Sequence, residues 1–395
     1  MTNHGVSGIN SSPQAQHRFH ELDGVRGLAA VFVGFWHSMV IWIDIGHSFL
    51  AKVLLSVFNG PAAVNTFFIL SGIVLAGLIK GIGVAPIIQF YFRRLTRLYI
   101  PVFFSVTIFS LFLLLINHAQ VNSGNGIWIN YFDNNAVTLK NYLGNMFAYR
   151  YNYNPVLWTI RVEIFFSVLF PIFYILWKHG RFVTDLFILF VLVLAAIVFR
   201  HEQQDGAWVI HYLYMFYTGM VMRRFLNGQK KYGRRKKFFM ASMVSLFVLF
   251  FVTSWFSSVC RSGAHPISFD LLSTVLIAVF LFTVLIEENS SIARVLTSRP
   301  IQFVGMISYS YYLINYLFIL IFGIIFMRYN IQEEVGHLPS TIILAISSFL
   351  ATIPISYLFF LAIEKPSVAF SRRLGAINIM MQAATTAKKF KNNLF

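Results

Sequence analysis

Residues Leu98 to Ile116 read LYIPVFFSVTIFSLFLLLI, a stretch of nineteen residues without a charged side chain. A helix of this length covers the roughly 30 Å hydrocarbon thickness of a bilayer, because each helical residue adds about 1.5 Å. Comparable apolar runs extend from Gly24 to Trp42, from Phe238 to Val259 and from Pro300 to Phe326. Such runs are typical of transmembrane helices, and they predict a protein that crosses a membrane several times.

The composition points the same way. Of the 395 residues, 57% are apolar and 11% are charged, and this charged share is about half that of an average soluble domain. There are too few polar groups to cover a surface that faces water, which excludes a soluble globular protein. The single cysteine, Cys260, cannot form an intramolecular disulfide, and no residue spacing indicates a zinc or haem site. We therefore expect no metal and no permanently bound cofactor.

We predict an all-α polytopic membrane protein with about ten transmembrane helices, which places both termini on the same side of the membrane. With this alternation, 24 of the 31 Lys and Arg residues lie on the side of the termini and 7 lie on the other side. Basic residues accumulate in cytoplasmic loops, so we expect both termini in the cytoplasm. The ten predicted spans are residues 24–42, 60–79, 99–117, 158–177, 183–199, 209–224, 238–259, 267–286, 301–326 and 341–363.

The predicted organisation is a cytoplasmic tail at 1–23, one transmembrane domain at 24–363 and a basic cytoplasmic tail at 364–395. The net charge of +17 then reflects topology and requires no nucleic-acid partner. The longest outer loop, residues 117–157, contains a weakly apolar stretch near Tyr142 to Tyr149 that predicts a short interfacial or re-entrant helix. Loops of this length are often functional, so this loop is a candidate substrate-binding region.

Ionisable residues inside apolar spans are costly and often mark a functional site. In the first span, Arg26 and His37 are eleven residues apart, and eleven steps of 100° bring them within about 20° of each other on one helix face. Asp23 lies on that face too. His37 is about 16 Å above Arg26 along the helix, in the outer half of the membrane. The structural alternative is a histidine that packs between helices.

Glu163 lies in the fourth span, which is predicted to run from the outer side inwards. It is about 21 Å from the cytoplasmic end of its helix, and His37 is about 20 Å from that side. Our hypothesis is that the two side chains converge on one cavity, where the carboxylate orients the imidazole as a base. The alternative is a structural pair of Glu163 with Arg161 or a tyrosine.

Three arginines, Arg93, Arg94 and Arg97, precede the third span. One helical turn brings them together, and guanidinium groups bind phosphate oxygens bidentately, so they form a candidate site for a phosphorylated ligand. A topological signal is the alternative interpretation. In the second span, Ser71 and Gly72 are small enough for close helix packing or for passage of a thin ligand.

Together these residues resemble the acyltransferase 3 family of membrane acyltransferases, and the similarity covers residues 20–366. The motifs that carry it are LDGVRGLAA at 22–30 followed by His37, FFILSG at 67–72, RRLTRLYIP at 93–101, LWTIRVE at 157–163 and ISYSYYL at 307–313. Many members have a histidine after the last motif, whereas this chain has Asn315. We therefore expect no ionisable group to act there.

The resemblance implies a multi-pass O-acyltransferase of the bacterial inner membrane. Such an enzyme transfers an acyl group, which we expect to be acetyl, from cytoplasmic acyl-CoA to a hydroxyl of a cell-surface carbohydrate such as exopolysaccharide or the lipopolysaccharide O-antigen. Acetyl-CoA is then a substrate, and the expected partners are the carbohydrate or a lipid-linked glycan, the bilayer and, as candidates, polysaccharide-assembly proteins.

The resemblance also implies roles for single residues. His37 removes the acceptor's hydroxyl proton or carries the acyl group, and Glu163 is the second catalytic residue. The residues expected to hold the coenzyme A phosphates are Arg26, Arg93, Arg94 and Arg97, with Asp23, Ser71 and Trp158 in supporting positions.

Three alternatives remain open from the sequence. A secondary transporter predicts internal pseudo-symmetry, and the two halves of the chain share no visible motif or hydropathy repeat. A structural partner of a polysaccharide synthase predicts that His37 is dispensable. Within the enzyme class, the acyl group could be succinyl, or the acceptor a small molecule.

Overall fold

The computed structural model describes residues 19–40, 49–79, 83–118, 137–199, 207–227, 236–260, 267–287 and 290–373. These residues are helical almost throughout and contain no β-strand element, which confirms the predicted all-helical class for the described part of the chain. The elements of the first half are α1 (His20–Val40), α2 (Phe49–Val57), α3 (Gly60–Leu75), α4 (Val84–His118), α6 (Leu139–Met146), α7 (Leu157–His179) and α8 (Phe182–Val198). The second half contains η2 (Ala207–Tyr212), α9 (Leu213–Asn227), α10 (Lys236–Cys260), α11 (Ile267–Ile286), α12 (Ser291–Leu296), α13 (Arg299–Arg328), α14 (Ile331–Val335), α15 (His337–Phe359) and the π-helical turn η3 (Phe360–Glu364).

Each of the ten predicted spans overlaps at least one helix in the described residues. Six helices are long and apolar enough to cross a membrane, namely Phe49–Leu75, Val84–Ile116, Leu157–His179, Ile267–Ile286, Arg299–Arg328 and His337–Arg373. Helix α8 is apolar but shorter. The count of ten crossings and the side of the termini therefore stay predictions. Residues 1–18 and 374–395 lie outside the described residues.

Large apolar side chains cover the outside of the bundle. Leu115 on α4 is 70% exposed, Val183 on α8 is 75% exposed and Phe247 on α10 is 63% exposed. Exposed apolar side chains of this size recur on most of the long helices. Soluble monomers rarely expose contiguous apolar surface on this scale, so the surface is suited to lipid.

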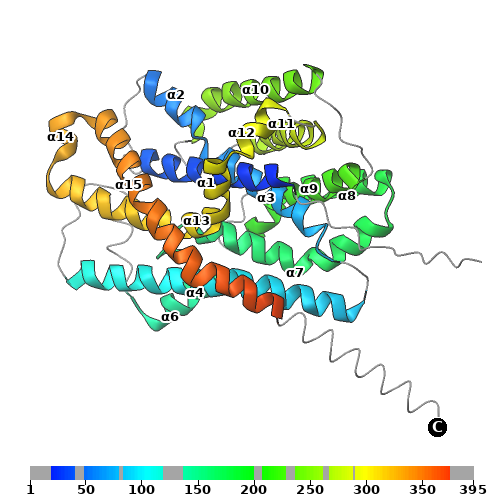
Figure 1. The fold of residues 1–395 in the computed structure, drawn as a ribbon, viewed down its shortest axis with the longest axis horizontal. Coiled ribbons are helices and arrows are strands. Elements are labelled where there is room, and N and C mark those ends of the chain that lie inside the picture. The colour runs from blue at the N-terminus through cyan, green and yellow to red at the C-terminus, as the bar shows by residue number, and fades with distance from the viewer. Residues whose placement is uncertain are drawn as a thin grey trace, which may run out of the picture.

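Helix α1 lies in the interior of the bundle, between α3 and α13, with α2 and α15 also against it (Figure 1). The close approach to α13 depends on glycine. A Cβ at Gly27 would meet the backbone of Gly305, including its Cα at 2.8 Å, and a Cβ at Gly305 would meet the backbone of Asp23. The polar first turns of α1 are therefore held against α13 at backbone contact distance.

Helices α3 and α9 cross in the same manner. A Cβ at Gly219 would meet the carbonyl oxygen of Ile69, the backbone nitrogen of Ile73 at 2.8 Å and the Cα of Gly72 at 3.0 Å. A Cβ at Gly72 would meet the carbonyl oxygen of Phe216. The predicted close packing around Ser71 and Gly72 is thus confirmed, with α9 as the neighbour.

The close crossing of α3 and α9 should contribute to the stability of the folded protein. Gly219→Ala forces α3 and α9 apart, and overpacking of this kind costs about 1–3 kcal/mol. We expect a clear drop in the thermal unfolding temperature of the purified protein in detergent. Gly83→Ala is the matched control, since a Cβ there meets only the Pro86 side chain at 3.7 Å. Equal unfolding temperatures for the two variants would contradict the crossing.

Residues 137–157 contain the short helix that the sequence predicted. Helix α6 packs along α4, where the Tyr142 hydroxyl lies 2.9 Å from Thr107 Oγ1 and the Phe147 ring lies 6.1 Å from that of Tyr99. Tyr99 and Thr107 belong to the middle of α4, and Figure 1 shows α6 against that part of the helix. Residues 137–157 therefore fold back along the bundle.

Candidate active site

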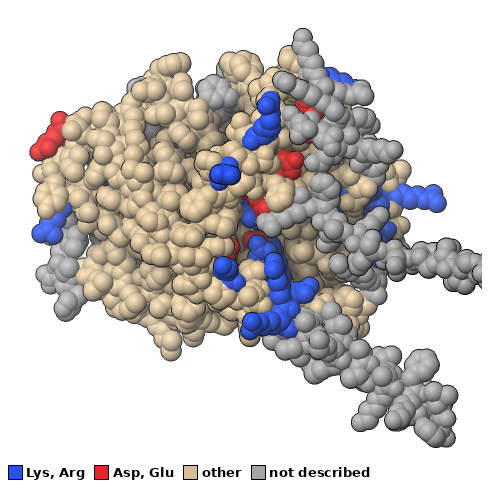
Figure 2. All heavy atoms as spheres, in the orientation of Figure 1, with Lys and Arg blue, Asp and Glu red and all other residues tan. Residues whose placement is uncertain are grey.

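Five helices enclose a pocket that is lined by charged and aromatic side chains. Its lining residues are Leu22, Asp23 and Arg26 of α1, Phe67, Phe68, Leu70, Ser71 and Val74 of α3, Arg94, Arg97 and Leu98 of α4, Thr159, Ile160 and Glu163 of α7, and Ser308, Tyr309 and Tyr312 of α13. The pocket encloses about 980 Å³ of empty space, counted with its mouth. Figure 2 shows basic and acidic side chains gathered at a recess near the middle of one face.

Arg26 joins α1 to α13. Its Nε donates to Ser308 Oγ at 3.0 Å, and its Nη2 donates to Asp23 Oδ1 at 3.0 Å and to the Gly305 carbonyl oxygen at 3.3 Å. Asp23 and Arg26 were predicted to share one helix face, and this is confirmed by the ion pair between them. Because Asp23 neutralises most of the charge of Arg26, this arginine acts first as a link between two walls of the pocket.

Arg94 joins α4 to α7. Its Nη2 forms an ion pair with Glu163 Oε1, and its Nε donates to Ser167 Oγ at 3.2 Å. Ser71 Oγ of α3 donates to the same Glu163 oxygen at 3.3 Å. The Arg94 and Glu163 side chains are only 10% and 19% exposed, so removal of either charge leaves the other poorly solvated.

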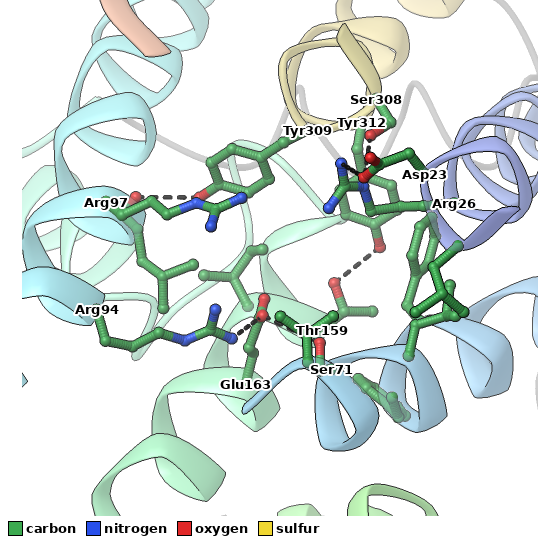
Figure 3. A pocket seen from close by; sticks show the side chains of 17 residues that line it. Asp23, Arg26, Ser71, Arg94, Arg97, Thr159, Glu163, Ser308, Tyr309 and Tyr312 are labelled. Atoms are coloured by element: carbon green, nitrogen blue, oxygen red, sulfur yellow. Dashed lines mark hydrogen bonds and ion pairs between the residues drawn. The ribbon is translucent and has the colours of Figure 1, made fainter. Parts of the chain in front are cut away.

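Arg97 also points into the pocket, beside Tyr309 (Figure 3), but it has no hydrogen bond or ion pair with any described residue. Tyr309 instead donates its hydroxyl to the Leu98 carbonyl oxygen at 3.0 Å. Arg26 and Arg94 repel the Arg97 guanidinium, and the Glu364 and Glu163 carboxylates attract it without contacting it. The pocket thus contains a guanidinium whose five N–H donors are free for a ligand.

The predicted contact between Glu163 and His37 is not formed. Glu163 bonds to Arg94 and Ser71, whereas His37 packs edge-on against the Tyr316 ring at 5.3 Å, and its buried Nδ1 has no hydrogen-bond partner among the described residues. The prediction rested on matching depth along two helices. Depth does not fix the direction in which a side chain points, and Glu163 faces α4 while His37 faces α13.

His37 is nevertheless close to the pocket along α13. Tyr316, which contacts His37, follows one helical turn after Tyr312, which lines the pocket, and one turn of helix rises about 5.4 Å. The Tyr312 hydroxyl in turn lies 2.8 Å from Thr159 Oγ1. A row of tyrosines therefore leads from the arginines towards the histidine.

Two other predicted residues lie outside the pocket wall. Arg93 is exposed, does not line the pocket and has no partner in the described part of the chain. Trp158 packs behind the wall, with its ring 6.3 Å from Phe68 and 5.4 Å from Tyr212. The predicted arginine cluster is therefore split, and Arg94 and Arg97 are the members that face the cavity.

Sequence reasoning missed Glu364. This buried residue ends the π-helical turn η3 and accepts hydrogen bonds from the backbone nitrogen of Ser310 at 3.2 Å and from Ser310 Oγ at 2.5 Å. Ser310 lies between the pocket residues Tyr309 and Tyr312 on α13. A glutamate at the end of the last apolar span was the available signal, since an intramembrane carboxylate is costly without a partner.

A family model described as an acyltransferase domain matches residues 19–361, a range that contains every residue lining the pocket. The chain belongs to the acyltransferase 3 family. The resemblance inferred from the motifs is confirmed, and the protein is a membrane acyltransferase. Comparison with curated proteins and with solved structures finds no match. In this acyltransferase 3 protein, the pocket between α1, α3, α4, α7 and α13 is the candidate active site.

The ion pair in this pocket makes a testable prediction. Loss of one partner of a buried pair is strongly destabilising, whereas replacement of both by apolar residues is often nearly neutral. We expect Arg94→Met and Glu163→Leu each to lower the free energy of unfolding by about 3 kcal/mol, and the double variant to lose less than either single variant. Unfolding in SDS–detergent mixed micelles measures all three. Simple additivity of the two losses would contradict the pairing.

Proposed function

We propose that this acyltransferase transfers an acetyl group from acetyl-CoA, bound from the cytoplasmic side, to a hydroxyl of a cell-surface carbohydrate such as exopolysaccharide or O-antigen. The observation that carries the proposal is the convergence of Arg26, Arg94 and Arg97 on one pocket, with Arg97 free of any described partner. Phosphate groups are the ligands that such a guanidinium cluster suits best.

The charges in the pocket indicate which arginine binds the phosphates of the acyl donor. Asp23 and Glu163 already neutralise Arg26 and Arg94, so the first phosphate of coenzyme A binds Arg97. Arg94 and Arg26 then supply further N–H donors at the rim of the same cavity. A ligand anchored in this manner extends its thioester arm along α13, past Tyr312.

The transfer chemistry centres on His37. As a general base, the imidazole takes the proton of the acceptor hydroxyl while the oxygen attacks the thioester carbonyl. The C–S bond then breaks, and the imidazolium gives its proton to the leaving coenzyme A thiolate. As a relay, the imidazole nitrogen attacks the thioester carbonyl and expels the coenzyme A thiolate, which takes up the imidazole N–H proton. The acceptor hydroxyl then attacks the acetyl-imidazole, which forms the ester, and its proton goes to the released imidazole. The free, buried Nδ1 of His37 is compatible with either role.

The acetyl group is favoured over a dicarboxylic acyl group by the surroundings of His37. The side chains packed against its ring are the aromatic residues Trp36 and Tyr316. A succinyl carboxylate placed there would lose its hydration without gaining a cationic partner, which is costly.

We also propose ten membrane crossings with both termini in the cytoplasm, and a bacterial inner membrane as the location. The distribution of Lys and Arg supports this orientation. The mouth of the arginine pocket then lies nearer the cytoplasmic supply of acetyl-CoA than His37 does.

Arg97 provides the test of donor binding. Arg97→Gln removes a charged donor set from the pocket, and charge-assisted hydrogen bonds are worth about 1.5–3 kcal/mol, so we expect the KM for acetyl-CoA to rise by at least about tenfold. Steady-state kinetics in proteoliposomes measure the change. Arg93→Gln is the matched control on the same helix, with a side chain exposed outside the pocket. Equal KM values for the two variants would contradict the assignment of Arg97 to the donor site.

His37 provides the test of catalysis. With radiolabelled acetyl-CoA we expect His37→Ala to lose at least about 100-fold of the thioester turnover, as general acid–base groups supply 10² to 10⁴. The control is His179→Ala, at an exposed position in the last turn of α7. Label trapped on the wild type and absent from His37→Ala would indicate the relay. Unchanged turnover in His37→Ala would exclude His37 from the chemistry.

A further inference from the structure

A second cluster of aromatic and cationic side chains lies next to the pocket. The Arg161 guanidinium lies 5.3 Å from the centre of the Tyr149 ring and 5.6 Å from that of Trp208, within the range of cation–π contacts. We call these three residues the aromatic platform. Trp158 and Tyr151 also contact Trp208, with their ring centres 5.9 and 6.4 Å from the centre of its ring.

The platform rests on a loop with a fixed, hydrogen-bonded shape. The buried Asn145 side chain accepts from the Tyr153 backbone at 3.1 Å and donates to Asn152 at 2.6 Å. Ala148, also buried, adopts a left-handed conformation with φ of 53°, which costs a residue other than glycine about 1–3 kcal/mol. The strained turn ends at Tyr149, whose side chain is nonetheless 69% exposed.

The strained turn holds the exposed Tyr149 ring beside the Arg161 guanidinium, in a fixed position. Arg161 adds a second sign of a binding site. Among the described residues, one of its five N–H groups donates a hydrogen bond, to the Tyr149 carbonyl oxygen at 3.3 Å.

Continuous ring contacts connect the platform to the active site. Trp208 contacts Trp158, and Trp158 contacts Phe68, which lines the pocket. On α7, Trp158 and Arg161 are three residues apart and lie beside Thr159 and Ile160 of the pocket wall. A substrate held on the platform would therefore approach the pocket across one helix.

We propose that the platform binds the acceptor, and that the acceptor is a pyranose sugar that bears an anionic group. Aromatic faces bind the C–H face of a sugar ring, and the free N–H donors of Arg161 bind a carboxylate bidentately. This inference rests on the proposed transfer to carbohydrate and adds the sugar class and its binding residues.

The test uses two matched ligands, methyl β-D-glucuronide and methyl β-D-glucoside, with tryptophan fluorescence of the detergent-purified protein as the readout. We expect the wild type to bind the glucuronide at least about tenfold more tightly than the glucoside. Arg161→Gln should abolish this preference. Tyr149→Ala, which removes an exposed ring and leaves the core intact, should weaken both ligands by roughly threefold to tenfold.

Arg328→Gln is the charge control, because Arg328 is an exposed arginine at the far end of α13, and it should bind both ligands as the wild type does. Equal affinity of the wild type for the two glycosides, or a glucuronide preference that survives Arg161→Gln, would overturn the platform. Failure of the wild type to turn over acetyl-CoA, with the glucuronide preference intact, would overturn the proposed transfer and leave the platform standing.

Discussion

The ion pair between Arg94 and Glu163 holds together the part of the molecule on which the chemistry depends. In an otherwise apolar helical bundle, a charged side chain is tolerated where another charge or a polar cavity meets it. Arg94 comes from α4, Glu163 comes from α7, and Ser71 of α3 bonds to the same carboxylate oxygen. Three helices are thereby fixed around one space. Arg97, one turn further along α4, is left without a counter-charge in contact, so the cavity keeps an affinity for anions.

The other side of the cavity depends on close backbone contact. Gly27 and Gly305 allow α1 and α13 to approach until Arg26 reaches both Ser308 and the Gly305 carbonyl oxygen. The same contact runs on to His37 and Tyr316. Arg26 and His37 are therefore carried by the same helix, and their separation follows from the rise of α1.

The sequence predicted the members of the pocket better than their contacts. Apolar runs and helical periodicity located the helices and placed Asp23 and Arg26 on one face, and rare ionisable groups singled out Arg94, Arg97 and Glu163. All of them line the cavity. The periodicity of one helix fixes which of its residues share a face, but it does not say which neighbour that face meets.

The prediction that Glu163 orients His37 was wrong for that reason, and Glu364 was missed because its partner, Ser310, is on a different helix 54 residues away. The helices that cross closely at Gly72 and Gly305 could not be identified from the sequence for the same reason. Glycine in a helix permits contact, but the identity of the contacting helix is a property of the tertiary fold. Arg93, Arg94 and Arg97 could be grouped by sequence, whereas the choice of which two enter the cavity required the position of α7.

The most direct test of the account is a cryo-electron microscopy map of the protein with bound acetyl-CoA. We predict phosphate density within hydrogen-bonding distance of the Arg97 and Arg94 guanidinium groups, with the thioester arm directed along α13 from Tyr312 towards His37. Coenzyme A density outside this pocket, or a thioester end directed away from His37, would contradict it.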